Sequence, residues 1–234
     1  MPPRDAPGPL IGAGRTADVF ALGPDRVVRR YRTHRDTQRE AGLMTYLAQA
    51  GFPVPRVYDS SGPDLVMERI QGRDMLADLG RRPWLVRRHA RSLAALHDRL
   101  HQIPAPPGLR ERYGSGDRVV HLDLHPGNVM LTPSGPVVID WDGAASGAPA
   151  VDVAMVWVII ASSDVDVLPR AQRPAAQTLR SVLLRQFLAA VHDDPAPVLA
   201  WVARVRMDDP HVRPGEIRRL EEIAARAERE AAAS

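Results

Sequence analysis

The residues best suited to chemistry lie in one short run, His121-Leu-Asp-Leu-His-Pro-Gly-Asn128. Asn128 is the only asparagine among the 234 residues, and it follows Asp123 by five positions. This spacing can set the Asp123 carboxylate against a hydroxyl group and turn the Asn128 amide oxygen toward Mg²⁺, an arrangement typical of phosphoryl transfer. Asp140, which follows the apolar stretch Val137-Val138-Ile139, is then a candidate for a second metal-binding carboxylate.

A second group of candidate residues lies near the start of the chain. Gly12-Ala-Gly14-Arg-Thr-Ala17-Asp-Val19 matches the pattern G-x-G-x-x-G-x-V, with Ala17 in place of the third glycine. Such a turn lets backbone N–H groups approach a phosphate, although a glycine pair between two strands can also serve only as a turn. The chain contains no lysine, so a cation that grips a phosphate must be arginine, with its planar fork of donors. Arg29 is the candidate, and Glu40 is its expected ion-pair partner.

The composition, with 44% apolar and 25% charged residues, is that of a globular chain long enough for one large core or two small lobes. The absence of cysteine excludes disulfides and thiolate metal sites and is compatible with the cytoplasm. The longest apolar stretch, Val153 to Ala161, is too short to span a bilayer, and the first residues form no apolar signal region. The arginines are not interleaved with aromatic residues. We therefore expect a cytoplasmic protein that contacts neither membrane nor nucleic acid. The sequence does not indicate an oligomeric state, and a monomer is the default.

The hydrophobic patterns predict an α+β protein. Short β-like runs occupy residues 10–14, 17–22, 26–32, 54–57 and 65–67, and a helix is expected from about residue 35 to 50, with Glu40 on its apolar face. After Gly72, a helical stripe runs from Leu85 to Leu100 through His89. A strand at 118–121 leads to Asp123, and a hairpin at 128–131 and 136–140 leads to Asp140. Further helices are expected at 151–162, 175–191 and 217–230.

The order of these features resembles the aminoglycoside phosphotransferase and choline kinase branch of the protein-kinase-like superfamily. The resemblance rests on His121 to Asn128, Ile139 to Asp142, Arg39-Glu40-Ala41, the Gly12 turn and Gly147-Ala-Pro-Ala-Val-Asp152, which is similar to the family's G-x-P-x-x-D segment. It implies a bilobal protein-kinase-like fold. Residues 1–70 would form an N-lobe with a small antiparallel sheet, and residues 71–234 a mostly helical C-lobe with the catalytic loop and the acceptor site.

The resemblance also implies roles for single residues. Asp123 would be the catalytic base or the carboxylate that orients the hydroxyl, Asn128 and Asp140 would ligate Mg²⁺, and Asp152 would anchor the catalytic loop. The nucleotide would be bound by the glycine turn, the arginine with its glutamate, and a hinge that contacts adenine through its backbone: Gly12, Gly14, Arg29, Glu40, Met67, Glu68 and Ile70.

The activity implied is Mg²⁺-dependent transfer of the γ-phosphate of ATP or GTP to a hydroxyl of a small molecule. An aminoglycoside-type or other cationic antibiotic is the preferred acceptor, which would make the chain a resistance kinase. A metabolite alcohol, such as an amino alcohol, a sugar or homoserine, is the rival acceptor. A nucleotide-binding pseudokinase that acts as an interaction module is the alternative from a different class. Only residues 141–151 separate Asp140 from Asp152, which is too short for an activation segment that docks a peptide.

Several residues have a less direct interpretation. Leu122 stands where this family usually has glycine, and Arg29 where kinases have lysine. We expect His121 and His125 to shape the loop rather than bind metal. We interpret His89 and His97 of the helical stripe as packed residues, and we regard Asp142 as either a metal ligand or a residue behind the ligands. Six acidic residues are candidates for contact with a cationic acceptor: Asp164, Asp166, Asp193, Asp194, Asp208 and Asp209.

Overall fold

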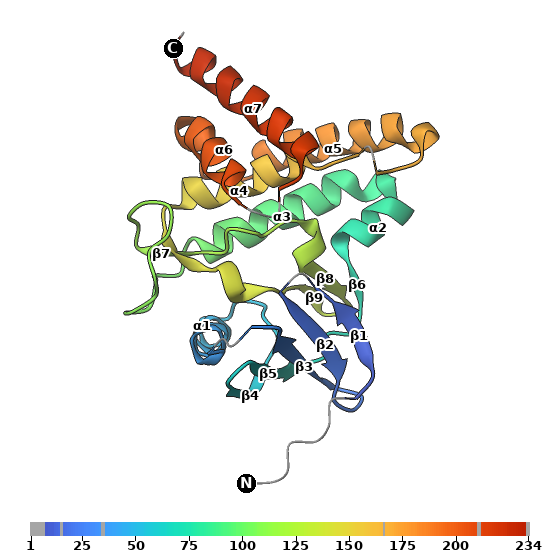
Figure 1. Cartoon of the computed structure of the whole chain (residues 1–234), viewed down its shortest axis with the longest axis vertical. Helices are drawn as coiled ribbons and strands as arrows, with labels where there is room; N and C mark the ends of the chain where they lie inside the picture. Colours follow the sequence, from blue (N-terminus) through green and yellow to red (C-terminus); the bar gives the residue numbers. More distant parts are fainter. Residues whose placement is uncertain (1–7, 15, 34–35, 166, 210–211, 233–234) are drawn as a thin grey trace. The chain divides into compact units, whose positions relative to one another are not determined.

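A computed structural model of the chain describes residues 8–14, 16–33, 36–165, 167–209 and 212–232. These residues divide into two compact units, one built mainly on antiparallel sheet and the other mainly helical, as expected for the α+β fold (Figure 1). The first unit contains the described residues up to Arg73 together with Met130–Asp142. The second contains Asp74–Val129 and the described residues from Gly143 onward.

The first unit is organised around a five-stranded antiparallel sheet with the strand order β1-β2-β3-β5-β4. Its elements are β1 (Leu10–Ala13), β2 (Ala17–Ala21), β3 (Arg26–Tyr31), α1 (Gln38–Gln49), β4 (Val57–Ser61) and β5 (Asp64–Glu68). Gly23, in the turn between β2 and β3, has φ 80°, a backbone conformation that favours glycine. Helix α1 lies beside β4, and its buried residues include Met44 and Leu47. The sheet fixes Arg29 at the centre of β3, opposite Val19 and Leu65.

The boundary between the units differs from the predicted division at residue 70. A three-stranded sheet has the order β6-β8-β9, formed by β6 (Arg73–Asp74), β8 (Val129–Thr132) and β9 (Gly135–Val138). Residues 130–142 belong to the first unit because the Val138 amide donates to the Pro53 carbonyl and Trp141 packs edge-on against Phe52. Gly72 also requires its small size, since a Cβ atom there would lie 2.2 Å from the Leu131 carbonyl oxygen.

The second unit is helical except for one short antiparallel pair of strands. Its elements are α2 (Met75–Arg81), η1 (Pro83–Leu85), α3 (Val86–Leu100), β7 (Arg118–Val120), η2 (Pro126–Asn128), β10 (Ala145–Gly147), α4 (Pro149–Ser162), η4 (Arg170–Gln172), α5 (Arg173–Leu188), η5 (Ala196–Val198), α6 (Leu199–Met207) and α7 (Pro214–Ala232), and η3 (Trp141–Gly143) precedes β10. Strand β7 pairs with β10 and leads into the Asp123 loop. Helix α4 is apolar on nearly all sides and is buried among the other helices, as its sequence predicted.

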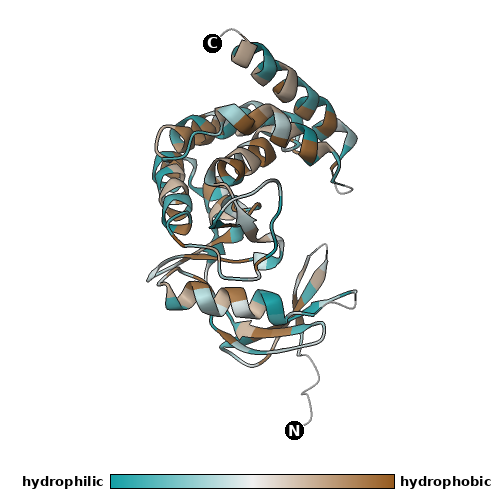
Figure 2. Ribbon diagram, turned by 90° about the vertical axis from the view of Figure 1, so that its left-hand side faces the viewer, coloured by the Kyte–Doolittle hydropathy of each residue, from teal (hydrophilic) through white to brown (hydrophobic). Residues whose placement is uncertain are grey.

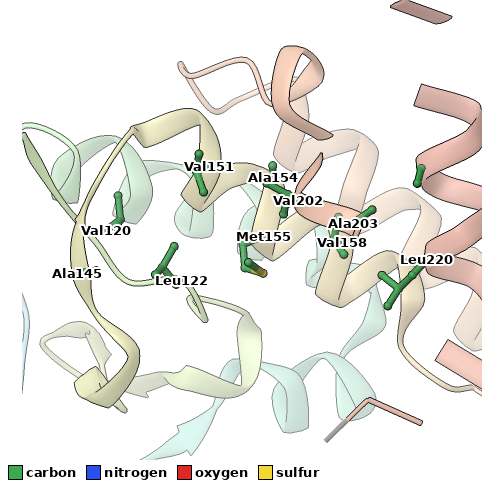
Figure 3. Packing of buried hydrophobic residues seen from close by; sticks show 11 residues of the cluster. Val120, Leu122, Ala145, Val151, Ala154, Met155, Val158, Val202, Ala203 and Leu220 are labelled. Atoms are coloured by element: carbon green, nitrogen blue, oxygen red, sulfur yellow. The ribbon is translucent and has the colours of Figure 1, made fainter. Parts of the chain in front are cut away.

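The core of the second unit extends from the strands to the C-terminal helices. The cluster joins Val120 and Leu122 to Met155 and Val158 of α4 and to residues of α6 and α7, and Figure 3 shows these residues along the core. Helix α7 carries an apolar stripe with charged residues on its other side, visible as alternating brown and teal in Figure 2. The loop that carries the candidate catalytic residues is therefore attached directly to the main core.

Most predicted elements are confirmed, but the strand at residues 54–57 was misplaced, and the helices α2 and α6 and the short strands β6 and β10 were not predicted. The strand expected at residues 54–57 begins only at Val57, because two prolines precede it in the chain. Helices α2 and α6 have seven and nine residues, which is too short for a clear helical period. The cap of α2 was a usable signal, since Asp74 Oδ1 accepts from the Ala77 amide at 2.7 Å. Among the described residues, no helix has both the length and the apolar character needed to cross a membrane.

Candidate active site

The candidate catalytic loop of the second unit holds Asp123 in a defined orientation. The Asn128 side-chain nitrogen donates to the Asp123 carbonyl oxygen at 2.8 Å and to Asp123 Oδ2 at 3.1 Å. Because both bonds use the nitrogen, the amide oxygen of Asn128 is directed elsewhere and can serve as a metal ligand. Asn128 is buried at the end of η2, whereas the Asp123 side chain is partly exposed and can reach a substrate.

The two histidines of the loop shape its backbone. Nδ1 of His121 accepts from the Asp123 amide at 3.3 Å, and Nδ1 of His125 accepts from the Gly127 amide at 3.0 Å. A neutral imidazole that accepts at Nδ1 carries its proton on Nε2. Nε2 of His125 lies 3.7 Å from Asp123 Oδ1, so this edge of His125 faces the candidate base. These contacts agree with the expectation that both histidines shape the loop.

Asp152 attaches the loop to helix α4. Its Oδ1 accepts from the Leu122 amide at 2.6 Å, and its Oδ2 accepts from the His121 amide at 3.0 Å. The carboxylate is completely buried, and burial by itself raises its pKa. Bonds from His101 and the loop amide overcome this effect and hold the pKa of Asp152 well below its usual value. The anchoring position implied by the resemblance is thus present as two hydrogen bonds to consecutive backbone amides.

The backbone conformation of Leu122 explains why the family that the sequence resembles usually has glycine at this position. Its φ is 67°, in the left-handed region that costs a residue with a Cβ atom about 1–2 kcal/mol. The leucine side chain is only 6% exposed and belongs to the core cluster with Val120, Ala145 and Met155 (Figure 3). The loop therefore keeps the glycine conformation while its side chain adds apolar contacts that glycine could not make.

The first unit contains the predicted cation and its partners. Arg29 donates from one terminal nitrogen to Glu40 at 3.1 Å and from the other to Asp140 at 2.5 Å. Glu40 also accepts from the Tyr31 hydroxyl at 2.6 Å. Burial acts to lower the pKa of Arg29, but Asp140 and Glu40 raise it above its usual value. The neighbouring Arg30 forms a separate pair with Asp64, as expected for the opposite face of the strand.

Asp140 is presented by a tight turn after β9. Its φ is 68°, a conformation that aspartate tolerates better than most residues, and its side chain is 41% exposed. The following Trp141 is buried, with its ring nitrogen donating to the Val138 carbonyl at 3.0 Å. Packing of Trp141 therefore fixes the turn while the carboxylate stays accessible.

Asn128 of the second unit and Asp140 of the first carry donor atoms of the kind that Mg²⁺ prefers. Asn128 offers an amide oxygen and Asp140 a carboxylate, both hard oxygen ligands. Within the part of the chain that the structure describes, no group of three or more histidine, cysteine or acidic side chains could enclose a metal ion. Few protein ligands are expected for Mg²⁺ at such sites, because substrate phosphates and water fill the remaining positions.

The glycine turn and the hinge have defined local structures. The Gly14 amide donates to the Ala17 carbonyl at 2.8 Å, which closes the β1–β2 turn. Gly12 lies in the sheet opposite Val19, while Arg15 lies outside the described residues. At the hinge, the Glu68 amide donates to the Arg56 carbonyl and so belongs to the sheet.

Met67 pairs with Val27 and Val57 at the end of β5, and Ile70 lies two residues beyond that strand. The hinge position of Met67, Glu68 and Ile70 is therefore compatible with the role implied by the resemblance, which stays a prediction.

Several acidic candidates for acceptor binding are used within the fold. Asp193 binds His101, Asp164 binds Arg219, and Asp209 binds Arg206. Asp194 accepts from the Ala196 amide, and Asp166 lies outside the described residues.

The packed histidines occupy buried positions on α3. His89 pairs with Asp78, and His97 is fully buried and packs edge-on against Phe187. His101 was not anticipated. Its position one turn after His97 was the available signal, but its two carboxylate partners are 51 and 92 residues away in the chain.

Comparisons with known proteins show a matching family and similar folds. The sequence profile of the phosphotransferase enzyme family matches residues 8–118 and 106–188. A choline/ethanolamine kinase family protein from Mesorhizobium loti is similar in structure, with a TM-score of 0.57, 16% identity, and coverage of 95% of this chain and 87% of the other.

The ADP-bound aminoglycoside phosphotransferase APH(2'')-Ib is similar with a TM-score of 0.59 and 14% identity, and the match covers 92% of this chain and 90% of the other. An amicoumacin kinase in complex with AMP-PNP, Ca²⁺ and its ligand is similar with a TM-score of 0.52 and 16% identity, and the match covers 94% of this chain and 87% of the other. At these identities the likeness shows the shared fold. No curated protein sequence matches the chain.

Proposed function

Because the chain belongs to the phosphotransferase enzyme family, we propose that it transfers the γ-phosphoryl group of a nucleoside triphosphate to a hydroxyl of a small molecule. The observation that carries this proposal is the pairing of Asp123 with Asn128, which orients one carboxylate and leaves one amide oxygen for a metal. Since the donor is a nucleotide, the cytoplasm is the expected place of the reaction.

The proposed reaction uses Asp123 to orient the acceptor. The hydroxyl oxygen forms a bond to the γ-phosphorus, its proton passes to the Asp123 carboxylate, and the bond to the β–γ bridging oxygen breaks to release the nucleoside diphosphate. Asn128 and Asp140 are the proposed ligands of Mg²⁺, which supplies neutralisation of negative charge on the phosphate oxygens. Asp152 keeps the backbone before Asp123 in place through its two amide contacts.

We propose that Arg29 provides the second positive charge for the nucleotide phosphates. Arg29 is only 8% exposed and its guanidinium is held by Glu40, so its fork is oriented before a nucleotide binds. Glu40 would act through Arg29, as the carboxylate that maintains this orientation. Gly12 and Gly14 would allow the β1–β2 turn to lie close to the phosphates, and the hinge at Met67, Glu68 and Ile70 would contact the base.

For the acceptor, we propose a cationic antibiotic of the aminoglycoside type, with metabolite alcohols as the rival class. Structural relatives include an aminoglycoside phosphotransferase and an amicoumacin kinase, but also a choline/ethanolamine kinase family protein. Acids such as Asp193, Asp164 and Asp209 already bind cations of the fold, which weakens their candidacy for the acceptor.

The test is a panel of antibiotics and metabolite alcohols assayed for acceptor-dependent release of ADP from ATP or GDP from GTP. Asp123→Ala should keep nucleotide binding and lose about 10²- to 10⁴-fold of turnover. Asp117→Ala is the matched control, because it removes an exposed carboxylate from the same unit. Wild-type turnover in Asp123→Ala would refute the assignment of Asp123. Nucleotide binding without Mg²⁺-dependent turnover on any acceptor would instead select the pseudokinase alternative.

A further inference from the structure

His101, the residue that follows α3, lies between two carboxylates of the second unit. Its Nε2 is 3.1 Å from Asp152 Oδ2, and its Nδ1 is 2.8 Å from Asp193 Oδ2. A carboxylate can only accept a hydrogen bond, so satisfying both contacts requires a proton on each ring nitrogen. The two contacts therefore indicate that His101 is an imidazolium ion, and the residue is only 3% exposed.

The charge on His101 has a specific task at Asp152. A buried carboxylate is strongly unfavourable unless a counter-charge accompanies it. Asp152 needs its ionised form because both of its oxygens accept amide hydrogens, one from His121 and one from Leu122. His101 supplies the positive charge in direct contact, and the Asp123 loop is held by the carboxylate that this charge stabilises.

The other titratable groups around this pair leave the charge on His101. His97 donates from Nδ1 to the Leu93 carbonyl at 2.9 Å, and burial lowers its pKa to about 4, so it is neutral near pH 7. His121, on the loop, accepts from the Asp123 amide through Nδ1. For His101 itself, burial acts to lower the pKa, but Asp152 and Asp193 raise it above its usual value.

Asp193 brings a further segment into the arrangement. It lies between α5 and η5, and the preceding residue, His192, is fixed because its amide donates to Asp98 of α3 at 2.9 Å. The Asp193 side chain is partly exposed, whereas Asp152 is fully buried. Asp193 can therefore be changed with less disturbance of the core, and its effect on the loop must pass through His101.

We propose that His101 is a positioning residue of the phosphotransfer site, and that its positive charge keeps the catalytic loop in place through Asp152. The inference rests on the proposed function for its effect on turnover, but not for its effect on structure. A group whose folded pKa is raised stabilises the fold below its unfolded value, about 6.5, and loses that contribution as pH rises through the folded value. The hold on the loop, and with it activity, is therefore expected to weaken on the alkaline side.

The first test measures the charge of His101 directly. Histidines can be titrated by NMR in the full chain, with His101→Gln used to identify the His101 signals among those of the eight histidines. Both ring nitrogens of His101 should remain protonated at pH values above the titration midpoint of an ordinary exposed histidine, about 6.5. Asp193→Asn should lower this midpoint and preserve the fold. A neutral His101 ring below that midpoint, or a midpoint unchanged by Asp193→Asn, would overturn the inference whether or not an acceptor is found.

The second test follows the loop by hydrogen exchange at the Leu122 amide. His101→Gln should speed this exchange on the order of tenfold or more, because it removes the positive charge that stabilises the Asp152 carboxylate, the acceptor of the Leu122 amide. His89→Gln is the matched control, because His89 is likewise a buried histidine paired with an aspartate. That aspartate is Asp78, whereas the loop amide donates to Asp152. Equal exchange in the two variants would contradict the role.

The third test uses the reaction, once an acceptor is known. His101→Gln should reduce kcat by about 10- to 100-fold with little change in the KM for the nucleotide. In Asp193→Asn the alkaline fall of kcat should move to lower pH. If exchange and NMR give the expected results but no acceptor-dependent turnover exists, the proposed function fails and the His101 assignment stands. An unchanged kcat profile in both variants of an active enzyme would refute the positioning role.

Discussion

Replacement of Leu122 by glycine and by alanine should separate backbone strain from core packing. Either change removes a side chain from a residue that is only 6% exposed. Truncation of a buried leucine lowers the free energy of unfolding by about 2–5 kcal/mol. Glycine then differs from alanine in two ways. It removes a strain of about 1–2 kcal/mol at φ 67°, and it loses about 0.5–1 kcal/mol because its unfolded chain is more flexible.

Leu124 provides the matched control within the same loop. It is fully buried, and it is not among the described non-glycine residues with positive φ. At residue 124 the step from alanine to glycine should destabilise by about 0.5–1 kcal/mol. At residue 122 the same step should be neutral or stabilising, since relief of about 1–2 kcal/mol outweighs the entropy loss.

The assay is urea unfolding of the four variants followed by tryptophan fluorescence, with the alanine-to-glycine difference in unfolding free energy taken at each position. The unfolded-state effect cancels between the two positions, so the difference between the differences, about 1–2 kcal/mol, measures the strain alone. Equal alanine-to-glycine steps at 122 and 124 would show that Leu122 carries no strain and that the explanation for its position is wrong.

The remaining predictions concern metal, nucleotide and acid stability. Asn128→Ala and Asp140→Ala should each raise the Mg²⁺ concentration needed for half-maximal turnover, with Asp140→Ala more severe because it removes a formal charge; Mg²⁺ titrations that overlay wild type would exclude both ligands. Arg29→Ala should weaken nucleotide binding more than Glu40→Ala, and the double variant should be less impaired than the summed single effects, as measured by calorimetry; strict additivity would mean that the two act separately. Bonds from Arg82 and His89 lower the pKa of Asp78 to about 2, so its stabilising contribution is present above its unfolded value of about 4 and is lost as pH falls toward 2. Asp78→Asn should therefore flatten the acid side of a plot of urea midpoint against pH, and an unchanged slope would refute this.

The sequence was sufficient for the features that depend on neighbouring residues. The strand carrying Arg29 and the helix carrying Glu40 follow from local patterns, and their contact is confirmed. Leu122 could be recognised as unusual only by comparison with a family pattern, and its left-handed backbone supplies the reason.

Features that depend on contacts between distant segments could not be predicted in the same way. The link from Asp193 through His101 to Asp152 joins a loop, the end of a helix and the start of another helix. A pattern within one segment contains no signal for such an ionised histidine. The transfer of residues 130–142 to the first unit likewise depends on pairing with Pro53 and packing against Phe52.

The proposed use of Arg29 at the phosphate position has a consequence for chemical labelling. Nucleotide analogues that acylate or sulfonylate an active-site lysine have no side-chain amine to modify anywhere in this chain. Arginine-directed dicarbonyl reagents would meet a guanidinium that is buried and bound to Glu40 and Asp140, while many exposed arginines compete for the reagent. Selective covalent inhibitors of this protein would therefore have to be directed at other side chains, and lysine-based profiling of nucleotide-binding proteins would pass over it.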